Sequence, residues 1–427
     1  MKVAFCTLGC KVIQYESQSM EQALIKRGFE CVEASEEADV YIVNSCTVTA
    51  ESDRKTRQNV RHLRKLHPDA VIVLTGCMPQ AFPEDARLLT QADIVTGNRS
   101  NKQIPDMIDE FFRTRERIVR IAQHENGEKF SGELINDFRE RTRATVKIED
   151  GCNRFCSYCV IPYARGRVRS KPLEDIREEI SSLEKKGFSE IVLVGINLSA
   201  YGTDCGASIC DAVELAASFD GIKRVRLGSL EPDHMTPDVT KRLAECKKLC
   251  PQFHISLQSG CDKTLKRMNR HYTAAEYEEL CTRLRSEFED ATLTTDVMVG
   301  FSGETKEDFE ISRDFVKKIG FEKVHVFPYS RRAGTRAAEF PDVVENAEKE
   351  RRSREMIAAA GEVRHEFLER QIGRTVEVLF EEKLRDGSTQ GYTANYTPVR
   401  IKSGCTHGLR KVKITACGDD WCEGELI

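Results

Sequence analysis

Short apolar runs alternate with amphipathic stretches over the first third of the chain. The apolar runs have the composition of buried parallel strands, and the stretches between them repeat apolar residues at the helical period. A βαβ alternation of this kind is typical of an open, doubly wound α/β sheet. We therefore predict strands at residues 2–7, 40–44, 71–75 and 93–96, helices at residues 15–27 and 52–66, and a polar linker at residues 123–132.

A second series of strand–helix units follows this linker. Six units are too few to close an eight-stranded barrel, so the pattern favours an open or partial (β/α)6 barrel. Active sites in such folds lie at the carboxyl ends of the strands. The predicted strands are residues 145–149, 191–194, 224–227, 254–257, 293–299 and 323–327, and the predicted helices are residues 172–186, 236–248, 274–288 and 306–319.

The pattern of charged and apolar residues changes again near the C-terminus. Residues 346–370 are highly charged and helix-forming, with opposite charges spaced i,i+4. After Gly373, short alternating segments separated by turn residues predict a small antiparallel β-barrel with strands at 375–380, 389–392, 399–401 and 409–416. We therefore expect three domains, at residues 1–125, 138–370 and 371–427.

Composition narrows the class of protein. No apolar stretch approaches the ~20 residues of a membrane span, and no basic leader precedes an apolar segment, so we expect a cytoplasmic protein with no membrane partner. The chain has 17 cysteines, which in such a protein are better explained as reduced thiols, some of them metal ligands, than as disulfides. The net charge of −4 requires any nucleic acid to bind at local basic patches.

Three cysteines stand close together directly after the first strand of the second series. Cys152, Cys156 and Cys159 can bind three irons of a cubane [4Fe–4S] cluster and leave the fourth iron without a protein ligand. An open iron is a place where a small molecule can bind. The alternatives are a zinc site or scattered core thiols, but zinc knuckles use paired CxxC units with four ligands, and no fourth Cys or His lies close by in sequence.

This CxxxCxxC loop, with an aromatic residue before its last cysteine, resembles the signature of the radical S-adenosylmethionine (SAM) superfamily. The resemblance implies that SAM binds the open iron and is cleaved to a 5′-deoxyadenosyl radical. It also implies SAM contacts from residues at the loop and at later strand ends, where the alternative is ordinary strand-end polar groups and turn glycines. These candidates are Tyr158, Gly195, Ser229, Glu231, Asp296 and Gly300.

Three further cysteines each follow a predicted strand of the N-terminal sheet. Cys10, Cys46 and Cys77 are far apart in sequence, but the carboxyl ends of strands in a doubly wound sheet converge on one crevice. They can therefore supply three thiolates to a second cubane. Buried structural cysteines are the alternative interpretation.

Residues 7–17, 44–49 and 75–77, which contain these cysteines, closely resemble motifs of the methylthiotransferase family. Ile13 and Ser302 depart from the family pattern, where Asn and Pro are usual, and neither is a cluster ligand. The resemblance implies a flavodoxin-like N-terminal domain, a radical SAM partial barrel and a TRAM barrel. It also implies an auxiliary [4Fe–4S] cluster that carries the methylated sulfur to be donated. One SAM methylates that sulfur, and a second yields the radical that takes hydrogen from adenine C2; no residue beyond the cluster ligands is assigned a catalytic role.

Basic residues form three patches, one in each predicted domain. They lie within residues 54–65, 165–171 and 400–413. Each patch alone is explained by a solvated surface, but together they favour a large polyanion such as the anticodon stem-loop of a tRNA. An electron donor such as flavodoxin or ferredoxin is implied as a second partner, and we expect a monomer.

The residues after the first N-terminal cysteine differ between branches of the family. Lys11-Val12, followed by residues 14–17, resembles the branch that acts on N6-threonylcarbamoyladenosine beside the anticodon. Its substrate carries a carboxylate, for which Lys11, Arg331 and Arg332 are candidate cations. The alternatives are an isopentenyladenosine tRNA, an aspartate of a ribosomal protein, or a non-catalytic iron–sulfur protein that carries electrons or binds RNA.

Overall fold

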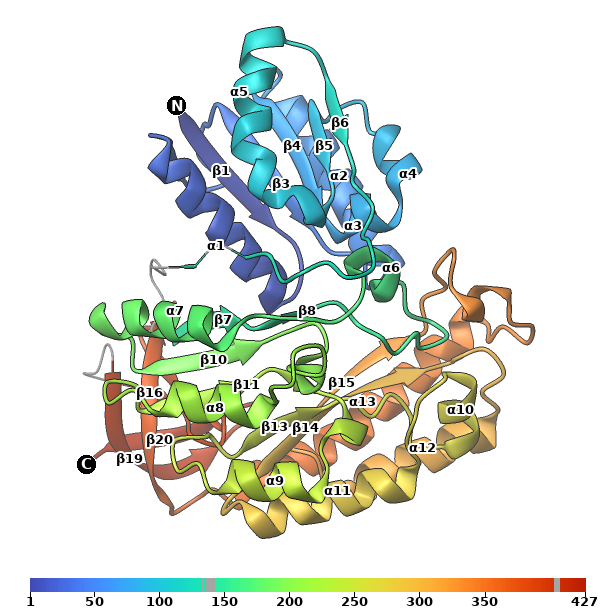
Figure 1. The fold of residues 1–427 in the computed structure, drawn as a ribbon. Helices are drawn as coiled ribbons and strands as arrows, with labels where there is room; N and C mark the ends of the chain where they lie inside the picture. The colour runs from blue at the N-terminus through green and yellow to red at the C-terminus, as the bar shows by residue number, and fades with distance from the viewer. Residues whose placement is uncertain (133, 136–142, 403–407) are drawn as a thin grey trace.

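The N-terminal third folds into a parallel six-stranded sheet. The computed structural model describes residues 1–132, 134–135, 143–402 and 408–427. The central strands β3 and β4 are buried along their whole length, and helices pack on both faces, which confirms the doubly wound arrangement (Figure 1). In spatial order the strands are β2 (Glu30–Val32), β1 (Lys2–Thr7), β3 (Val40–Ser45), β4 (Val71–Gly76), β5 (Ile94–Thr96) and β6 (Ile118–Arg120).

Two helices of the N-terminal sheet, at residues 11–26 and 50–66, lie where helices were predicted, and the other helices of this part were not predicted. One face carries α1 (Lys11–Lys26) and α5 (Ile104–Thr114), and the other carries α2 (Ala50–Leu66). Helix α1 begins at Lys11, earlier than predicted, because the β-branched Val12 and Ile13 are poor helix formers but are buried by packing here. The edge strands β2 and β6 were not predicted, since each is only three residues long and partly exposed. The short elements are α3 (Cys77–Ala81), α4 (Pro83–Arg87) and η1 (Asn98–Gln103).

The middle of the chain forms the predicted partial barrel. Its parallel strands divide into a sheet of three, β11-β10-β7, and a sheet of four, β12-β13-β14-β15, with the break at Gly228 between β11 and β12. The strands are β7 (Arg143–Lys147), β10 (Glu190–Val194), β11 (Arg224–Leu227), β12 (Ser229–Leu230), β13 (Gln252–Ile255), β14 (Thr292–Val299) and β15 (Lys323–Pro328).

Helices cover the outer side of these strands, and a small hairpin closes the cysteine loop. The helices are α7 (Leu173–Lys185), α8 (Ile209–Ala217), α9 (Pro237–Ala244), α10 (Asp262–Arg267), α11 (Ala274–Glu287) and α12 (Lys306–Ile319). An unpredicted antiparallel pair, β8 (Glu149–Asp150) and β9 (Arg169–Ser170), brings the two ends of the loop together around α6 (Ile161–Arg165).

Helix α13 (Asn346–Glu369) leads into a closed five-stranded barrel, in the order β16-β17-β18-β20-β19. Four pairings are antiparallel, and β18 pairs with β20 in parallel. Strand β20 was not predicted because its sequence is dominated by charged and small residues. The bounds are β16 (Thr375–Lys383), β17 (Thr389–Thr393), β18 (Pro398–Ile401), β19 (Gly408–Cys417) and β20 (Cys422–Leu426).

The N-terminal part contacts the partial barrel around α1 and α6 (Figure 1), whereas the C-terminal barrel contacts the first residues of three strands, Arg143 of β7, Arg224 of β11 and Thr292 of β14. Arg226 of β11 donates to the backbone oxygens of Thr393 and Ala394 in the C-terminal barrel, both at 2.8 Å. The chain limits 1–125, 138–370 and 371–427 stay a prediction. Within the described ranges, no helix combines the length and the apolar character that a membrane crossing requires.

Candidate functional site

The three-cysteine loop is held in place by backbone hydrogen bonds. Cys152 N donates to Gly166 O at 3.0 Å, and Cys159 N donates to Cys156 O at 3.0 Å. Ser157, between the last two cysteines, donates its amide to Met268 O at 2.9 Å and its hydroxyl to Arg267 O at 2.8 Å. The loop is therefore fixed at both ends and anchored in its middle.

The loop thiols lie among donors that stabilise thiolates. Burial raises the pKa of Cys152 to about 12 and raises the pKa of Cys159 above its usual value, with Cys156 adding to both. Arg270 donates to the sulfur of Cys156 at 3.4 Å, and the Asn197 amide donates to the sulfur of Cys152 at 3.8 Å. Buried thiols of raised pKa bind metal as thiolates only where cations and donors offset the charge, as these do.

A pair of unsatisfied acceptors lies beside the loop. Glu149 Oε2 accepts the Asn197 backbone N–H at 2.7 Å, but Glu149 Oε1 and Asn197 Oδ1 are buried without a partner. Burial also raises the pKa of Glu149 well above its usual value. A Cβ on Gly195 would stand 2.6 Å from Glu149 Oε2, so only glycine fits there. An ammonium group bound here would favour the ionised form of Glu149 and could donate to both unpartnered oxygens, so these residues fit the amino group of SAM.

The other predicted SAM residues fall into two groups. Ser229 and Asp296 line a large cavity, with Asp296 3.2 Å from His254 Nε2. Tyr158 packs edge-on to Phe301, with ring centroids 6.3 Å apart, and Glu231 pairs with Arg270 at 2.5 Å. Gly300 has a φ of +69°, donates to Glu304 at 2.6 Å and faces Lys349 of α13. It lies outside the cavity lining, and all six assignments stay predictions.

The structure brings the three N-terminal cysteines together. Cys10 is the exposed N-cap of α1, while Cys46 and Cys77 are buried after β3 and β4. Burial raises the pKa of Cys77 to about 12, and the neighbouring Cys46 and Cys10 contribute to that rise. A Cβ on Gly9 would stand 2.9 Å from the Cβ of Cys46, so the glycine allows this close approach. The convergence fits a cluster site, and the ligand roles stay predictions.

Neither cysteine set forms a single-ion site. Among the described side chains, no three Cys, His, Asp or Glu residues converge on one metal ion. A cubane cluster binds each thiolate to a different iron, so its three ligands need not meet at one point.

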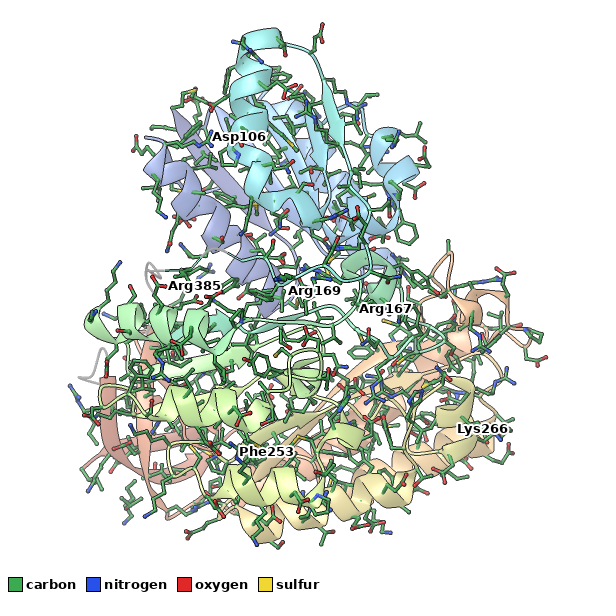
Figure 2. The ribbon with its side chains drawn as sticks, viewed as in Figure 1. Asp106, Arg167, Arg169, Phe253, Lys266 and Arg385 are labelled. Atoms are coloured by element: carbon green, nitrogen blue, oxygen red, sulfur yellow. The ribbon has the colours of Figure 1, made fainter. Side chains whose placement is uncertain are left out.

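Arg165 is a site residue whose role the sequence did not reveal. Its Nε donates to the sulfur of Cys77 at 3.1 Å. We interpreted residues 165–171 as a surface patch for RNA, and for three of them this was wrong. Arg165 and Arg169 are buried in ion pairs with Glu16 and Asp150, which folding brings to them, and Lys171 is buried against Glu179 of α7. Arg167 is exposed over the Phe155 ring, and Figure 2 shows Arg167 and Arg169 at the junction.

A cavity of about 1160 Å³ joins all three parts of the chain. The N-terminal part supplies Cys10 and Lys11, the partial barrel supplies Gly195, Ser229 and Asp296, and the C-terminal barrel supplies aromatic and basic side chains. Tyr392 and Tyr396 are stacked with centroids 4.5 Å apart, and Arg400 lies 3.6 Å over the Trp421 ring. Stacked aromatics beside arginines are typical of surfaces that bind bases. The cationic lining consists of Lys11, Arg226, Lys323, Arg364 and Arg400.

Of the three candidate cations for a substrate carboxylate, only Lys11 lines this cavity. It is open to the water of the cavity, and the surrounding protein together with Arg143 and Arg226 lowers its pKa to about 8. Arg332 is buried against Thr47 and Asp53, at 2.7 and 2.6 Å. Arg331 is exposed and bonds to Ala338 O. Neither arginine is placed to meet a ligand in the cavity.

Comparison with known proteins gives the family. Residues 146–316 match the radical SAM superfamily, and residues 2–97 match the uncharacterized protein family UPF0004. The chain is 35% identical to the threonylcarbamoyladenosine tRNA methylthiotransferase MtaB of Bacillus subtilis, over 100% of this chain and 96% of that protein. It is also 35% identical to the tRNA-2-methylthio-N(6)-dimethylallyladenosine synthase of Pelotomaculum thermopropionicum, over 92% and 90% of the two chains.

A solved structure supports the fold independently. The radical SAM methyltransferase TsrM of Kitasatospora setae superposes with a TM-score of 0.55 at 15% identity, over 76% of this chain and 72% of that one. The radical SAM match implies SAM and a [4Fe–4S] cluster. With full-length relatives and both cysteine motifs in place, the chain belongs to the radical SAM methylthiotransferases.

Proposed function

We propose that this enzyme methylthiolates adenine C2 of N6-threonylcarbamoyladenosine next to the tRNA anticodon, with two [4Fe–4S] clusters and SAM. The observation that carries the proposal is the shared cavity, which is bounded by Cys10, by Gly195, Ser229 and Asp296, and by the C-terminal barrel. A transfer that needs a sulfur donor, a radical source and a nucleic-acid base requires all three at one place.

The protein's part is to hold and orient these components. Cys152, Cys156 and Cys159 would bind the cluster that cleaves SAM to a radical, and Cys10, Cys46 and Cys77 would bind the cluster that carries the sulfur. Glu149 and Asn197 offer free acceptors to the amino group of SAM, and Gly195 lets its backbone approach closely.

The C-terminal barrel and α2 would bind the RNA. Arg54, Lys55, Arg61 and Lys65 of α2 are exposed, as are Lys402, Arg410, Lys411 and Lys413 on the barrel. These cations suit phosphates, and the Tyr392–Tyr396 stack at the cavity offers a platform for a base. An electron donor such as flavodoxin or ferredoxin would reduce the clusters, and the monomeric state stays an expectation.

Lys11 supports the choice of modified base. Relatives of this chain include enzymes named for a threonylcarbamoyl adenosine, which carries a carboxylate, and for a dimethylallyl adenosine, which is apolar. Lys11 stands next to Cys10 on the cavity wall, where the arginines around it are already paired: Arg226 with Glu190 at 2.7 Å and Arg143 with Glu381. The ammonium of Lys11 is therefore available for a substrate carboxylate, an interaction of charged groups that an apolar substrate does not make.

The test offers purified, reconstituted enzyme tRNAs with either modification and measures the methylthio product by mass spectrometry. We expect preference for threonylcarbamoyladenosine, a loss of roughly tenfold or more of that preference in Lys11→Met, and partial recovery in Lys11→Arg. Preference for the dimethylallyl tRNA, or product only on a ribosomal protein, would defeat the substrate assignment.

A further inference from the structure

The guanidinium of Arg165 is a fully buried cation beside Cys77. Arg165 has no exposed surface, and it is among the largest fully buried side chains of the described chain. It ends helix α6, directly downstream of the three-cysteine loop, yet it reaches the other set, with Nε 3.1 Å from the sulfur of Cys77. A residue that is adjacent in sequence to the three-cysteine loop thus contacts a predicted ligand of the N-terminal set.

Arg165 is held in this position by Glu16 of helix α1. Its Nη2 donates to Glu16 Oε2 at 3.0 Å, and Nη1 pairs with Glu16 Oε1. Ala164, the preceding residue, packs with Ile13 and Cys77, and its carbonyl oxygen accepts the Asn98 amide at 2.7 Å. The guanidinium is therefore fixed on both sides, and its Nε–H is left to face the sulfur.

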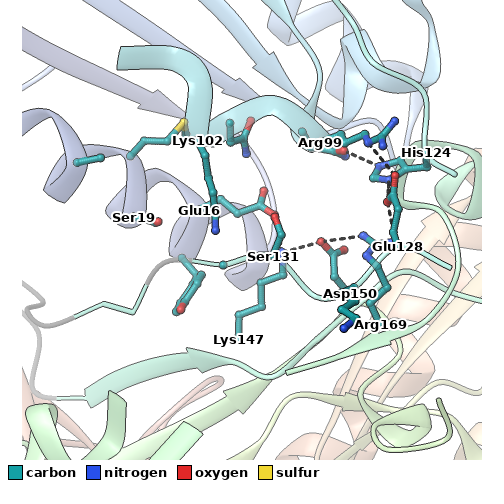
Figure 3. A pocket seen from close by; sticks show the side chains of 17 residues that line it. Glu16, Ser19, Arg99, Lys102, His124, Glu128, Ser131, Lys147, Asp150 and Arg169 are labelled. Carbon is teal, nitrogen blue, oxygen red and sulfur yellow. Dashed lines mark hydrogen bonds and ion pairs between the residues drawn. The ribbon is translucent and has the colours of Figure 1, made fainter. Parts of the chain in front are cut away.

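The charged groups around Arg165 form one buried ionic network. Glu16 also accepts from Lys147 Nζ at 2.7 Å, and Asp150 pairs with Lys147 at 2.7 Å, with Arg169 at 3.4 Å and with Arg165 at 3.5 Å. Two carboxylates thus serve three buried cations. Part of this network lines a polar cavity of about 260 Å³ beside α1, in which Glu16, Lys147, Asp150 and Arg169 are drawn (Figure 3).

Further acids extend this network away from Cys77. Glu128 pairs with Arg99 at 2.7 Å and with His124 at 2.8 Å, and it stands 3.7 Å from Arg169. Arg99 also pairs with Glu125 at 3.0 Å, so Glu128 remains available to Arg169. Of these cations, Arg165 is the one whose guanidinium bonds directly to the sulfur of Cys77.

We propose that Arg165 is a positioning residue for the auxiliary cluster: its N–H···S bond and its charge hold the Cys77 thiolate and raise the cluster's reduction potential. The inference rests on the proposed role of Cys77 as a cluster ligand. Hydrogen bonds to a ligand sulfur and a nearby positive charge stabilise the reduced, more negative state of an iron–sulfur cluster. The radical SAM part of the chain thus sets a property of the sulfur-carrying site.

The experiment isolates the auxiliary cluster in the full-length chain by replacing Cys152, Cys156 and Cys159 with Ala. In this parent, the midpoint potential is measured by a redox titration followed by electron paramagnetic resonance. We expect Arg165→Gln to lower the reduction equilibrium constant about tenfold, which is about 59 mV for a one-electron couple. Arg165→Lys keeps the charge but not the planar Nε donor, so a smaller shift in the same direction is expected.

Arg169→Gln is the matched control, because Arg169 belongs to the same ionic network without bonding to a cysteine sulfur. An unchanged potential in an iron-loaded Arg165→Gln variant, or an equal shift in Arg169→Gln, would overturn the proposal. If Arg165→Gln binds no iron, the potential of Arg165→Lys is compared with those of the parent and of Arg169→Gln instead. An unchanged potential in Arg165→Lys, or an equal shift in Arg169→Gln, would then overturn the proposal. A parent that binds no cluster would instead refute the ligand role of Cys77 and, with it, the proposed function.

Discussion

The two cysteine sets have the same number of cysteines but are assembled in opposite ways. Cys152, Cys156 and Cys159 lie in one loop, closed by the β8–β9 pair and anchored through Ser157. The other set is assembled from three strand ends of a parallel sheet, and its geometry depends on the whole sheet. A contiguous loop carries its own scaffold, whereas a dispersed set exists only after the domain has folded.

The surroundings of the two sets are nonetheless alike. Each has an amide donor to one sulfur, Asn197 for Cys152 and Asn98 for Cys77. Each also has a buried arginine that bonds to a sulfur and pairs with a glutamate: Arg270 with Glu231, and Arg165 with Glu16. The shared arrangement places an amide donor and a cation beside a buried or partly buried sulfur in each set.

The largest expected effect comes from deleting the loop thiols. Replacing Cys152, Cys156 and Cys159 together with Ala should remove about half of roughly eight irons per reconstituted chain and abolish reductive SAM cleavage. Cys10, Cys46 and Cys77 are positioned by the N-terminal sheet, so the iron that they bind should remain. Iron analysis and detection of 5′-deoxyadenosine measure both outcomes, and an unchanged iron content would show the loop assignment to be wrong.

A smaller effect should show how strongly the dispersed set depends on its sheet. Gly76 precedes Cys77 with a φ of +99°, and a Cβ there would stand 2.5 Å from Ser45 N. Gly28 has a φ of +85° and no atom within 4 Å of its would-be Cβ. Gly76→Ala should lower the free energy of unfolding by about 2–5 kcal/mol, because backbone strain and crowding add. It should also lower the amount of iron bound at the N-terminal cysteines.

Gly28→Ala is the control, because it introduces the strained backbone conformation without crowding. It should lower the free energy of unfolding by about 1–2 kcal/mol and leave the iron content unchanged. Denaturant unfolding and iron content measure both variants. Equal losses in the two variants would mean that crowding against β3 does not shape the cysteine site.

The smallest expected effects come from the paired amides. The N···S distances are long, 3.8 Å for Asn197 and 3.9 Å for Asn98, so each bond is weak. Each Asn→Ala variant should lower the potential of its own cluster by less than the tenfold equilibrium shift expected for Arg165→Gln. The measurement is a redox titration of each cluster. A shift in the reduction potential of the other cluster would contradict the claim that each amide acts on the sulfur it contacts.

The contrast also explains what the sequence could predict. The loop spacing and the strand-end cysteines were visible locally, because motif spacing and strand periodicity are local properties. Arg165 and Arg169 were misplaced on the surface because their partners Glu16 and Asp150 are brought to them only by folding. The short strands β2, β6 and β20 were missed because they are brief or strongly charged, so tertiary pairing rather than local pattern defines them.

The most direct test of the division of labour is a full-length variant in which Cys10, Cys46 and Cys77 are replaced by Ala. Reconstituted protein, SAM, a reductant and tRNA are combined, and 5′-deoxyadenosine and methylthio product are quantified in the same sample. We predict continued SAM cleavage, because the loop of Cys152, Cys156 and Cys159 is intact, with no methylthio product. Product at the normal rate would contradict the role of the dispersed cysteines as the sulfur-donating site.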